Sequence, residues 1–278
     1  MKVNKNKFLE KLHQNKFLIV VHRGSHGGNV IENTSDAVKV SQLQHADMIE
    51  IDISMSTDND FFIFHDGGEE RLLNETRNIQ ELSTAEINSK HFRNALGETI
   101  TKSVETFDYF YDHINHDVLL NIDRSWDYWD TFLPELDRYE AMREYFILKS
   151  PVKREYLEKL NNHSVQYLYF PIVTSVEDLE ILADYPNLNI IGFEIIENKP
   201  QFTLINAPEL DKYRNGDYMF LGNSIKLNDK TDLFGKLDDN LALLSGVDWS
   251  WSRILNFGIN TIQTDWPDIL NDYRNRLN

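Results

Sequence analysis

Short apolar runs alternate with amphipathic stretches along the chain. Nine of these runs have the length and the β-branched or aromatic content of strands. The predicted strands are Phe17–Val21, Met48–Ser54, Phe61–Phe64, Val118–Ile122, Tyr145–Leu148, Gln166–Ile172, Asn189–Ile196, Tyr218–Ile225 and Asn260–Gln263. The predicted helices lie near Thr34–Gln44, Ser83–Asn88, Val104–His113, Trp126–Arg143, Lys153–Leu160, Ser175–Asp184, Leu237–Leu244 and Trp251–Phe257. Such alternation is typical of parallel strands joined by crossover helices, so the predicted fold class is α/β and the architecture a (β/α)8 TIM barrel.

Nine strands are one more than a barrel of eight needs. The gap between Met48–Ser54 and Phe61–Phe64 is too short for a crossover helix, so these two runs are predicted to form a hairpin that turns in the middle of Thr57–Asp60. A turn centred there places Asp52 directly opposite His65. The hairpin therefore brings an acidic residue and a histidine together.

Polar residues at the carboxyl ends of the strands are the candidates for chemistry, since barrels of this kind carry their active site there. Glu50 and Asp52 alternate within an apolar strand and share one face, and Asp123 ends a neighbouring strand. If that face is the barrel interior, burying these anions together is costly without a cation. Three hard carboxylate ligands suit Mg²⁺ or Ca²⁺ better than zinc. The alternatives are a solvent-exposed edge strand for Glu50 and Asp52, and a strand-end cap for Asp123.

Two histidines occupy similar positions in the pattern. His22 and His65 each follow a predicted strand and precede a charged residue. Such a pair is suited to act as general acid and general base around one phosphorus, whereas the alternative is two unrelated structural histidines. Arg23 offers a planar fork that can clamp a phosphate, although surface ion pairing is the common use of a lone arginine. No role is predicted for the other seven histidines.

Composition and charge narrow the range of partners. The 278 residues include 28 Lys and Arg against 45 Asp and Glu, which gives a formal charge of −17 at pH 7. This balance argues against nucleic acid or an anionic bilayer as the main partner, because both would be repelled. The sequence has no cysteine, which excludes disulfides, thiolate metal sites and a cysteine nucleophile.

The sequence predicts no transmembrane segment, because it has no run of about 18 apolar residues. The N-terminal segment has a basic start and a short apolar run that is interrupted by charges and leads directly into His22. This pattern predicts a helix followed by the first strand and not a signal peptide. A cytoplasmic location is expected on this basis.

Several motifs occur in an order that resembles the glycerophosphodiester phosphodiesterase family, a group of phospholipase C-like phosphodiesterase barrels. They are VVHRG, ENTSDAV, ADMIEIDISMSTDNDFFIFHD, VLLNIDRS and, near the end, GINTIQTDWPDIL. The match is dense over Phe17–Ile87 and Gly258–Leu270 and thin from about Arg124 to Phe257. Each motif is weak alone, but the ordered set is specific.

The resemblance implies one barrel domain over residues 1–278, with a small insertion after the second-strand hairpin at about residues 66–116. It implies hydrolysis of glycerophosphodiesters to glycerol 3-phosphate and an alcohol, with a divalent cation, Mg²⁺ or Ca²⁺, as cofactor. The small-molecule phosphodiester is then the expected partner. The implied roles are acid and base for His22 and His65, metal ligands for Glu50, Asp52 and Asp123, a phosphate contact for Arg23, and ordering of the first loop by Glu32 and Asn33.

The sequence departs from the family pattern at the third metal ligand. The family usually has Glu there, followed two residues later by Lys, whereas this chain has Asp123, Arg124 and Ser125. The shorter Asp can still bind a metal, for example through a water, but the missing Lys removes one phosphate contact. Arg124 alternates away from the face of Asp123, so Lys149, at the end of the next strand, is the predicted replacement.

Two other readings stay open at this level. The substrate could be a lysophospholipid or a sugar phosphodiester, recognised by aromatic residues near strand ends, although core packing is the commoner use of such residues. These aromatics are Trp249, Trp251, Trp266, Tyr169 and Phe193. The missing Lys also fits a non-catalytic barrel that binds a phosphorylated ligand. Whether water or a hydroxyl of the substrate attacks, the latter through a cyclic phosphate, is not decided by the sequence.

Overall fold

The computed structural model describes residues 1–214 and 216–277; Asn215 and Asn278 lie outside the described residues. The strands are β1 Leu18–Val21, β2 Met48–Met55, β3 Phe61–Ile63, β4 Leu119–Asp123, β5 Phe146–Pro151, β6 Leu168–Val173, β7 Asn189–Ile190, β8 Gly192–Ile195, β9 Met219–Asn223 and β10 Thr261–Thr264. The α-helices are α1 Asn6–Gln14, α2 Ser35–Leu43, α3 Glu69–Leu73, α4 Thr84–Asn88, α5 Phe107–His113, α6 Trp129–Leu136, α7 Arg154–Asn162, α8 Val176–Ala183, α9 Asp211–Arg214, α10 Asp239–Ser245, α11 Trp251–Asn256 and α12 Pro267–Arg276.

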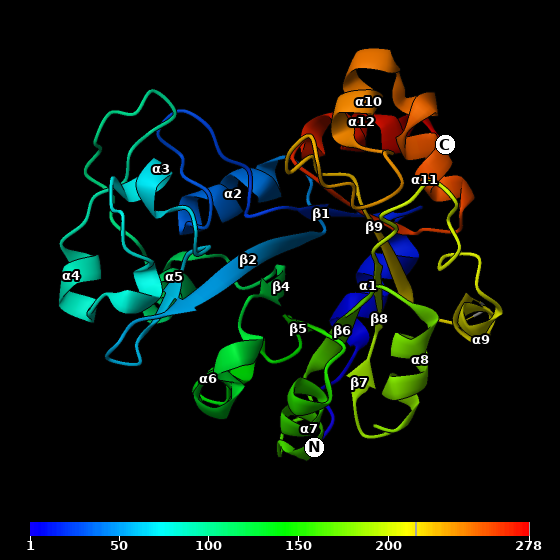
Figure 1. The fold of residues 1–278 in the computed structure, drawn as a ribbon, viewed down its shortest axis with the longest axis horizontal. Coiled ribbons are helices and arrows are strands. Elements are labelled where there is room, and N and C mark those ends of the chain that lie inside the picture. The colour runs from blue at the N-terminus through cyan, green and yellow to red at the C-terminus, as the bar shows by residue number, and fades with distance from the viewer. Residues whose placement is uncertain (215, 278) are drawn as a thin grey trace.

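The strands form a closed barrel. Within the described chain, eight parallel strands follow the order β1-β10-β9-β8-β6-β5-β4-β2, and pairing of β1 with β2 closes the ring. The strands are apolar on both faces because one face fills the barrel and the other packs on helices. Helices α6, α7 and α8 cover one side of the strands, and α2, α10, α11 and α12 cover the other (Figure 1). The predicted (β/α)8 barrel is confirmed.

The second strand does form the predicted hairpin, but its predicted register is wrong by one residue. β2 and β3 are antiparallel, and Ile53 pairs with Ile63. Asp52 therefore faces Phe64, whose N–H donates to the Asp52 carbonyl at 3.0 Å, and His65 lies one residue beyond. The reason is the loop, which has five residues between β2 and β3, so the turn centres on a residue and not between two.

Other elements differ from their predicted bounds. The predicted strand Asn189–Ile196 is two short strands, β7 and β8, of which β7 pairs only with β6. The predicted helix Trp126–Arg143 contains only α6, flanked by 3₁₀ turns. The sequence pattern did not predict α12, the C-terminal helix.

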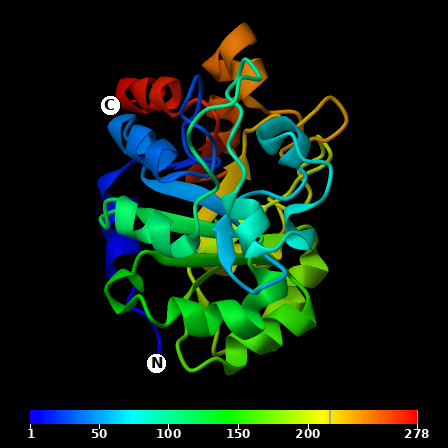
Figure 2. The same ribbon diagram turned by 90° about the vertical axis from the view of Figure 1, so that its left-hand side faces the viewer.

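A second hydrophobic core lies beside the barrel. It includes Phe62, Phe64, Leu72, Ile87 and Phe92 and is separate from the main core that fills the barrel and the strand–helix layer. We call residues 64–104, which supply most of this second core, the side module. It contains α3 and α4 and stands at one side of the barrel, in front of it when the molecule is turned by 90° (Figures 1 and 2). In the described residues, no helix is long and apolar enough to cross a membrane.

Candidate active site

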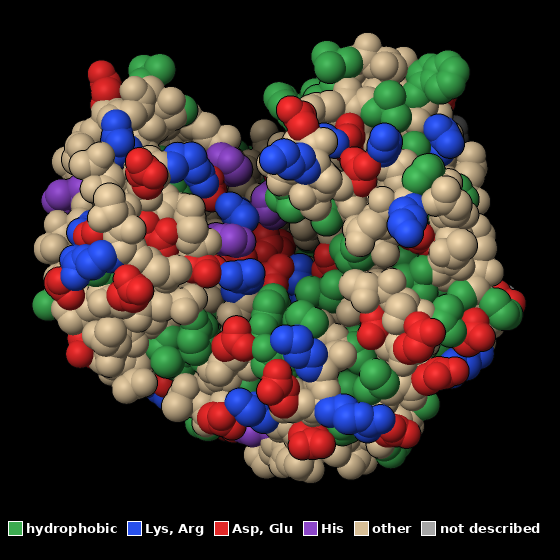
Figure 3. Space-filling model, in the orientation of Figure 1, with side chains coloured by type: hydrophobic (Ala, Val, Ile, Leu, Met, Phe, Trp, Pro, Cys, Tyr) green, Lys and Arg blue, Asp and Glu red, His purple; other side chains and the backbone are tan. Residues whose placement is uncertain are grey.

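The surface is hollowed between the side module and the C-terminal helices (Figure 3). Acidic, basic and histidine side chains lie at the bottom of this hollow, which is the end of the barrel where parallel strands point their carboxyl ends. The polar residues that follow the strands are therefore expected to meet in this hollow.

Three carboxylates converge there. Glu50 and Asp52 project from β2, and Asp123 ends β4, which pairs with β2 so that Asp52 and Asp123 are neighbours. One carboxylate oxygen from each residue lies within 4.8 Å of the other two. Glu50 and Asp52 are buried and Asp123 is half-buried. The expected convergence of these three acids is present, and the exposed-edge alternative is not.

The electrostatics of this cluster favour a cation. Burial raises the pKa of the Glu50 carboxyl well above its usual range, and the nearby charges of Asp52 and Asp123 raise it further, against the opposing effect of Lys149 and Arg23. Three hard oxygen donors with excess negative charge fit a divalent cation such as Mg²⁺ or Ca²⁺. The residues present therefore fit the metal that the sequence implies.

His22 follows β1 and is oriented by a carboxylate. Its Nδ1 lies 2.9 Å from Oδ1 of Asp265, which follows β10. The backbone N–H of Asp265 in turn donates to Asp239 Oδ2 at 2.9 Å. Burial raises the pKa of Asp239 to about 7, with a smaller contribution from the charge of Asp265. This chain of contacts occupies Nδ1 of His22 and leaves Nε2 to face a ligand.

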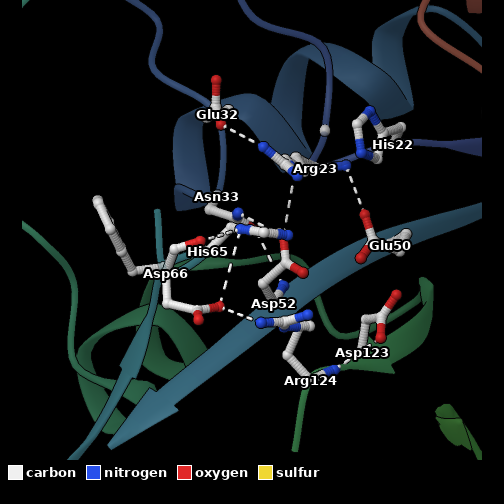
Figure 4. A network of polar contacts seen from close by, with 12 residues as sticks. His22, Arg23, Glu32, Asn33, Glu50, Asp52, His65, Asp66, Asp123 and Arg124 are labelled. Atoms are coloured by element: carbon white, nitrogen blue, oxygen red, sulfur yellow. Dashed lines mark hydrogen bonds and ion pairs between the residues drawn. The ribbon is translucent and has the colours of Figure 1, made fainter. Parts of the chain in front are cut away.

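His65 follows β3 and is oriented by a backbone carbonyl. Its Nδ1 lies 2.5 Å from the carbonyl oxygen of Asp66. A carbonyl only accepts hydrogen bonds, so Nδ1 carries a proton and Nε2 is the ring nitrogen left to face a ligand. Both histidines therefore present Nε2, and both lie beside the acids in the close view (Figure 4).

Arg23 connects the acids to the first loop. Its backbone N–H donates to Glu50 Oε2 at 2.9 Å, and its Nε lies 3.2 Å from Asp52 Oδ2. Its Nη1 donates to Glu32 Oε1 at 2.9 Å, and Arg71 donates to both oxygens of the same carboxylate at 2.8 Å. Burial acts to raise the pKa of Glu32, but the bonds from Arg71 and Arg23 lower it to about 2. Glu32 is thus a permanent anion between two guanidinium groups.

Asn33 fixes Asp52 through two hydrogen bonds. Its Nδ2 donates to Asp52 Oδ2 at 2.9 Å, and the Asp52 backbone N–H donates to Asn33 Oδ1 at 3.0 Å. Asn33 has φ +56°, a left-handed conformation that Asn tolerates better than most residues. The next residue, Thr34, caps α2. The side chain of Asn33 therefore joins the first loop to β2, as the predicted supporting role requires.

Lys149 is buried beside Asp123. Its Nζ is 2.5 Å from Asp123 Oδ2 and 3.0 Å from Glu194 Oε2, and its side chain is 2% exposed. These carboxylates raise its pKa in spite of burial. The ammonium therefore already has two anionic partners, and its contact with a phosphate stays a prediction.

Arg124 points differently from what strict alternation predicts. Its φ of +58° turns the chain after Asp123. Its Nη2 consequently lies 2.5 Å from Asp66 Oδ1, next to His65, and its side chain is 38% exposed (Figure 4). Arg124 thus offers an accessible positive charge at the mouth of the site, whereas the charge of Lys149 is enclosed.

Comparison with known proteins shows the family of this chain. A sequence model described as the glycerophosphoryl diester phosphodiesterase family matches residues 22–163, about half of the chain. The chain belongs to this family. Members of the glycerophosphoryl diester phosphodiesterase family are phosphoric diester hydrolases, and this chain is an enzyme of that class.

Solved structures share the fold at low sequence identity. A glycerophosphoryl diester phosphodiesterase from Parabacteroides distasonis has a TM-score of 0.68 and 17% identity, over 96% of this chain and 91% of that one. A glycerophosphodiester phosphodiesterase from Agrobacterium tumefaciens has a TM-score of 0.61 and 19% identity, over 91% and 98%. An Oleispira antarctica phosphodiesterase, solved with the product sn-glycerol-3-phosphate, has a TM-score of 0.63 and 17% identity, over 92% and 95%. No curated protein matches the chain.

Sequence reasoning missed some polar residues in the barrel of this phosphodiesterase family member. Glu194 on β8 contacts Lys149, and Asn223 on β9 donates to Glu194 Oε1 at 2.5 Å. Gln263 on β10 is also buried. Glu194 is a lone polar residue inside an apolar strand, and this is the signal that identified Glu50, so it could have been found. Asn223 and Gln263 stand next to or near other polar residues, Ser224 and Thr264, and that signal does not single them out.

The aromatic residues that were considered for substrate recognition separate into two groups. Trp251, Tyr169 and Phe193 are fully buried core residues, whereas Trp249 is 61% exposed and Trp266 is 48% exposed. Trp266 lines a cavity of about 370 Å³ together with His22 and Asp265. Among these five, Trp266 is therefore the aromatic residue placed beside the candidate acid–base machinery.

Proposed function

We propose that this family member is a metal-dependent glycerophosphodiester phosphodiesterase that releases glycerol 3-phosphate and an alcohol. One observation carries the proposal: three converging carboxylates lie beside two histidines that both present Nε2. The Oleispira antarctica relative of the same fold was solved with sn-glycerol-3-phosphate, which supports this product.

The residues at the site have two kinds of role, stabilisation of negative charge and transfer of protons. Glu50, Asp52 and Asp123 would hold the cation, which supplies charge stabilisation at a non-bridging phosphate oxygen. Arg23 contacts the phosphate from the side of the first loop. Arg124 contacts it from the side of His65, in the role that a lysine has in other members of the family. Both guanidinium groups favour the extra negative charge of the transition state.

The two histidines act on opposite oxygens. His22 takes the proton of the attacking oxygen, because the Asp265 carboxylate beside Nδ1 stabilises the charged ring that results. The new P–O bond forms as the bond to the alcohol breaks, and His65, entering this step as the imidazolium with a proton on each ring nitrogen, gives its Nε2 proton to the departing alkoxide. The same two groups serve whether the attacking oxygen belongs to water or to a neighbouring hydroxyl of the substrate.

The test is release of glycerol 3-phosphate from glycerophosphocholine and glycerophosphoglycerol. EDTA should abolish the release, and Mg²⁺ or Ca²⁺ should restore it. H22A and H65A should each lower kcat about 10²- to 10⁴-fold. H116A, at an exposed histidine remote from the acids, is the matched control and should keep full activity. Wild-type activity in H22A or H65A, or activity that survives EDTA, would contradict the proposal.

A second candidate substrate class is favoured by Trp266. Its exposed ring and the 370 Å³ cavity beside His22 offer a stacking surface for a sugar or an apolar chain on the alcohol. Adding a lysophospholipid and a sugar phosphodiester to the same panel separates the two classes. Lower kcat/KM for these substrates in W266A, with glycerophosphocholine unaffected, would favour the second class.

A further inference from the structure

A second pocket lies next to the site, between the β1–α2 loop and the side module. Its volume is about 250 Å³, and its lining includes His26, Arg71 and Arg93 with a single carboxylate, Glu32. The whole chain has a net charge of −17, so a pocket with two arginines, a histidine and one acid differs sharply from the average surface. Basic and histidine side chains are visible on the wall of the hollow formed by the side module (Figure 3).

Arg93 brings an uncompensated charge to this pocket. Its Nε donates to the Gly97 carbonyl at 2.8 Å, and its Nη1 donates to Asn74 Oδ1 at 3.3 Å. Both acceptors are neutral, and among residues 1–214 and 216–277 no carboxylate forms an ion pair with Arg93. These two bonds use two of the five N–H donors of the guanidinium. The remaining donors are available to a ligand.

The loop around Arg93 is shaped to hold the guanidinium. Gly97 has φ +78°, and a Cβ at this position would lie 2.9 Å from Nη2 of Arg93. The guanidinium therefore packs directly on the glycine backbone. A side chain at position 97 would displace it from the pocket wall.

The pocket is connected to the candidate active site through Glu32. Oε1 of Glu32 accepts from Arg23 at 2.9 Å and from Arg71 at 2.8 Å. Arg23 is the proposed phosphate contact, and Arg71 lines the pocket with a side chain that is 58% exposed. Only the Glu32 carboxylate therefore separates the pocket from the proposed phosphate contact, Arg23. A substrate group a few bonds from the scissile phosphate can reach the pocket.

We propose that this pocket binds a second anionic group, a phosphate or a carboxylate, carried on the alcohol half of the substrate. The proposal rests on the proposed function, since it assigns a preference to the same enzyme. Guanidinium groups recognise phosphate and carboxylate oxygens through N–H bonds, and the unused donors of Arg93 can form them. Arg71 is already bonded to both oxygens of Glu32 and adds its positive charge to the pocket. A cationic or apolar alcohol gains nothing from these neighbours. The preferred substrates are therefore diesters whose alcohol is itself an anion.

The experiment compares two diesters that differ only in the second anion. They are glycerophosphoglycerol and the same molecule with a phosphate on its terminal hydroxyl. We measure kcat/KM for both with Mg²⁺, and the Kd of both by calorimetry in EDTA, where binding does not depend on turnover. The variants are R93Q, R93K and G97A. R253Q, at an exposed arginine on α11, removes the same charge elsewhere and is the control.

The wild-type enzyme should prefer the phosphorylated diester, and R93Q should lower the ratio of the two kcat/KM values about 10-fold or more. G97A should act in the same direction, R93K should be intermediate, and R253Q should keep the wild-type ratio. The Kd ratio in EDTA should follow the same order. Equal ratios in wild type and R93Q, in both measurements, would overturn the inference.

The two proposals fail in different ways. If the enzyme hydrolyses glycerophosphoglycerol but R93Q changes neither the kcat/KM ratio nor the Kd ratio, the second pocket is excluded and the proposed function stands. If neither diester is hydrolysed, the proposed function fails, and the Kd ratio in EDTA still decides whether the pocket binds the second anion.

Discussion

Lys149 and Arg124 are the two cations available to replace the missing lysine, and their surroundings predict opposite effects of substitution. Lys149 is enclosed by Asp123 and Glu194, with 2% of its side chain exposed. Arg124 is 38% exposed, and within residues 1–214 and 216–277 its one ion pair is with Asp66. We predict that K149M mainly lowers stability and that R124Q mainly lowers activity.

The magnitudes follow from burial. Removing one partner of a buried ion pair costs about 3–5 kcal/mol, because Asp123 and Glu194 are left without their cation. In a domain of this size this is roughly 6–20 °C in Tm. The half-exposed pair of Arg124 and Asp66 contributes about 1 kcal/mol or less to stability after solvent screening. A lost charged hydrogen bond to the phosphate costs about 1.5–3 kcal/mol, which is about 10- to 100-fold in kcat/KM.

Thermal unfolding and steady-state hydrolysis of glycerophosphocholine, assayed at least 15 °C below the lowest Tm, separate the two effects. R138Q is the control for R124Q, because Arg138 forms an exposed ion pair with Glu135 on the surface. It should change neither Tm nor kcat/KM. An R124Q enzyme with wild-type kcat/KM, or a K149M enzyme with wild-type Tm, would refute the reasoning.

Three further predictions concern the groups that support the site. N33G should lower the free energy of unfolding by about 2–4 kcal/mol, because it removes both hydrogen bonds to Asp52. N33A should lower it by about 1 kcal/mol more, because a Cβ is strained at φ +56°. Urea unfolding measures both free energies, and equal stability of the two variants would contradict the strain. Burial raises the pKa of Asp239 from 3.8 to about 7, so its contribution to stability is complete below about pH 4 and is lost as the pH rises through 7. The free energy of unfolding should therefore decline by up to about 4 kcal/mol between about pH 4 and about pH 7, and D239N should reduce this decline. The same pH dependence in wild type and D239N would contradict the role given to Asp239. Mg²⁺ at 100 times its Kd should stabilise the fold by about 2.7 kcal/mol, seen as a higher Tm that E50Q largely loses.

The barrel could be predicted from the sequence because buried parallel strands need apolar residues on both faces. The acids could be found for the same reason, since Glu50 and Asp52 interrupt an otherwise apolar run and a buried charge needs a chemical purpose or a partner. The strand-end pattern also identified His22 and His65, and the family resemblance then added the ordered loop.

What could not be predicted depended on single backbone dihedrals and on distant partners. A four-residue and a five-residue loop both fit the hairpin sequence, and the choice between them shifts the register by one residue. Alternation fails for Arg124 because its φ is positive. The polar sequence of α12 gave little helical signal, yet its Arg274 is buried and hydrogen-bonded to Asp47 and to the Phe17 carbonyl.

The separate core of the side module has a consequence for how such an enzyme diversifies. Arg71 and Arg93 are mounted on apolar residues that do not belong to the barrel interior, so the segment that carries them can change in length and composition without disturbing the strands that carry the acids. A transplant of residues 67–104 from another barrel of this fold, which leaves His65 and Asp66 in place, is then expected to transfer selectivity for the leaving alcohol while the hydrolytic step is retained. Selection can act on the two properties almost independently.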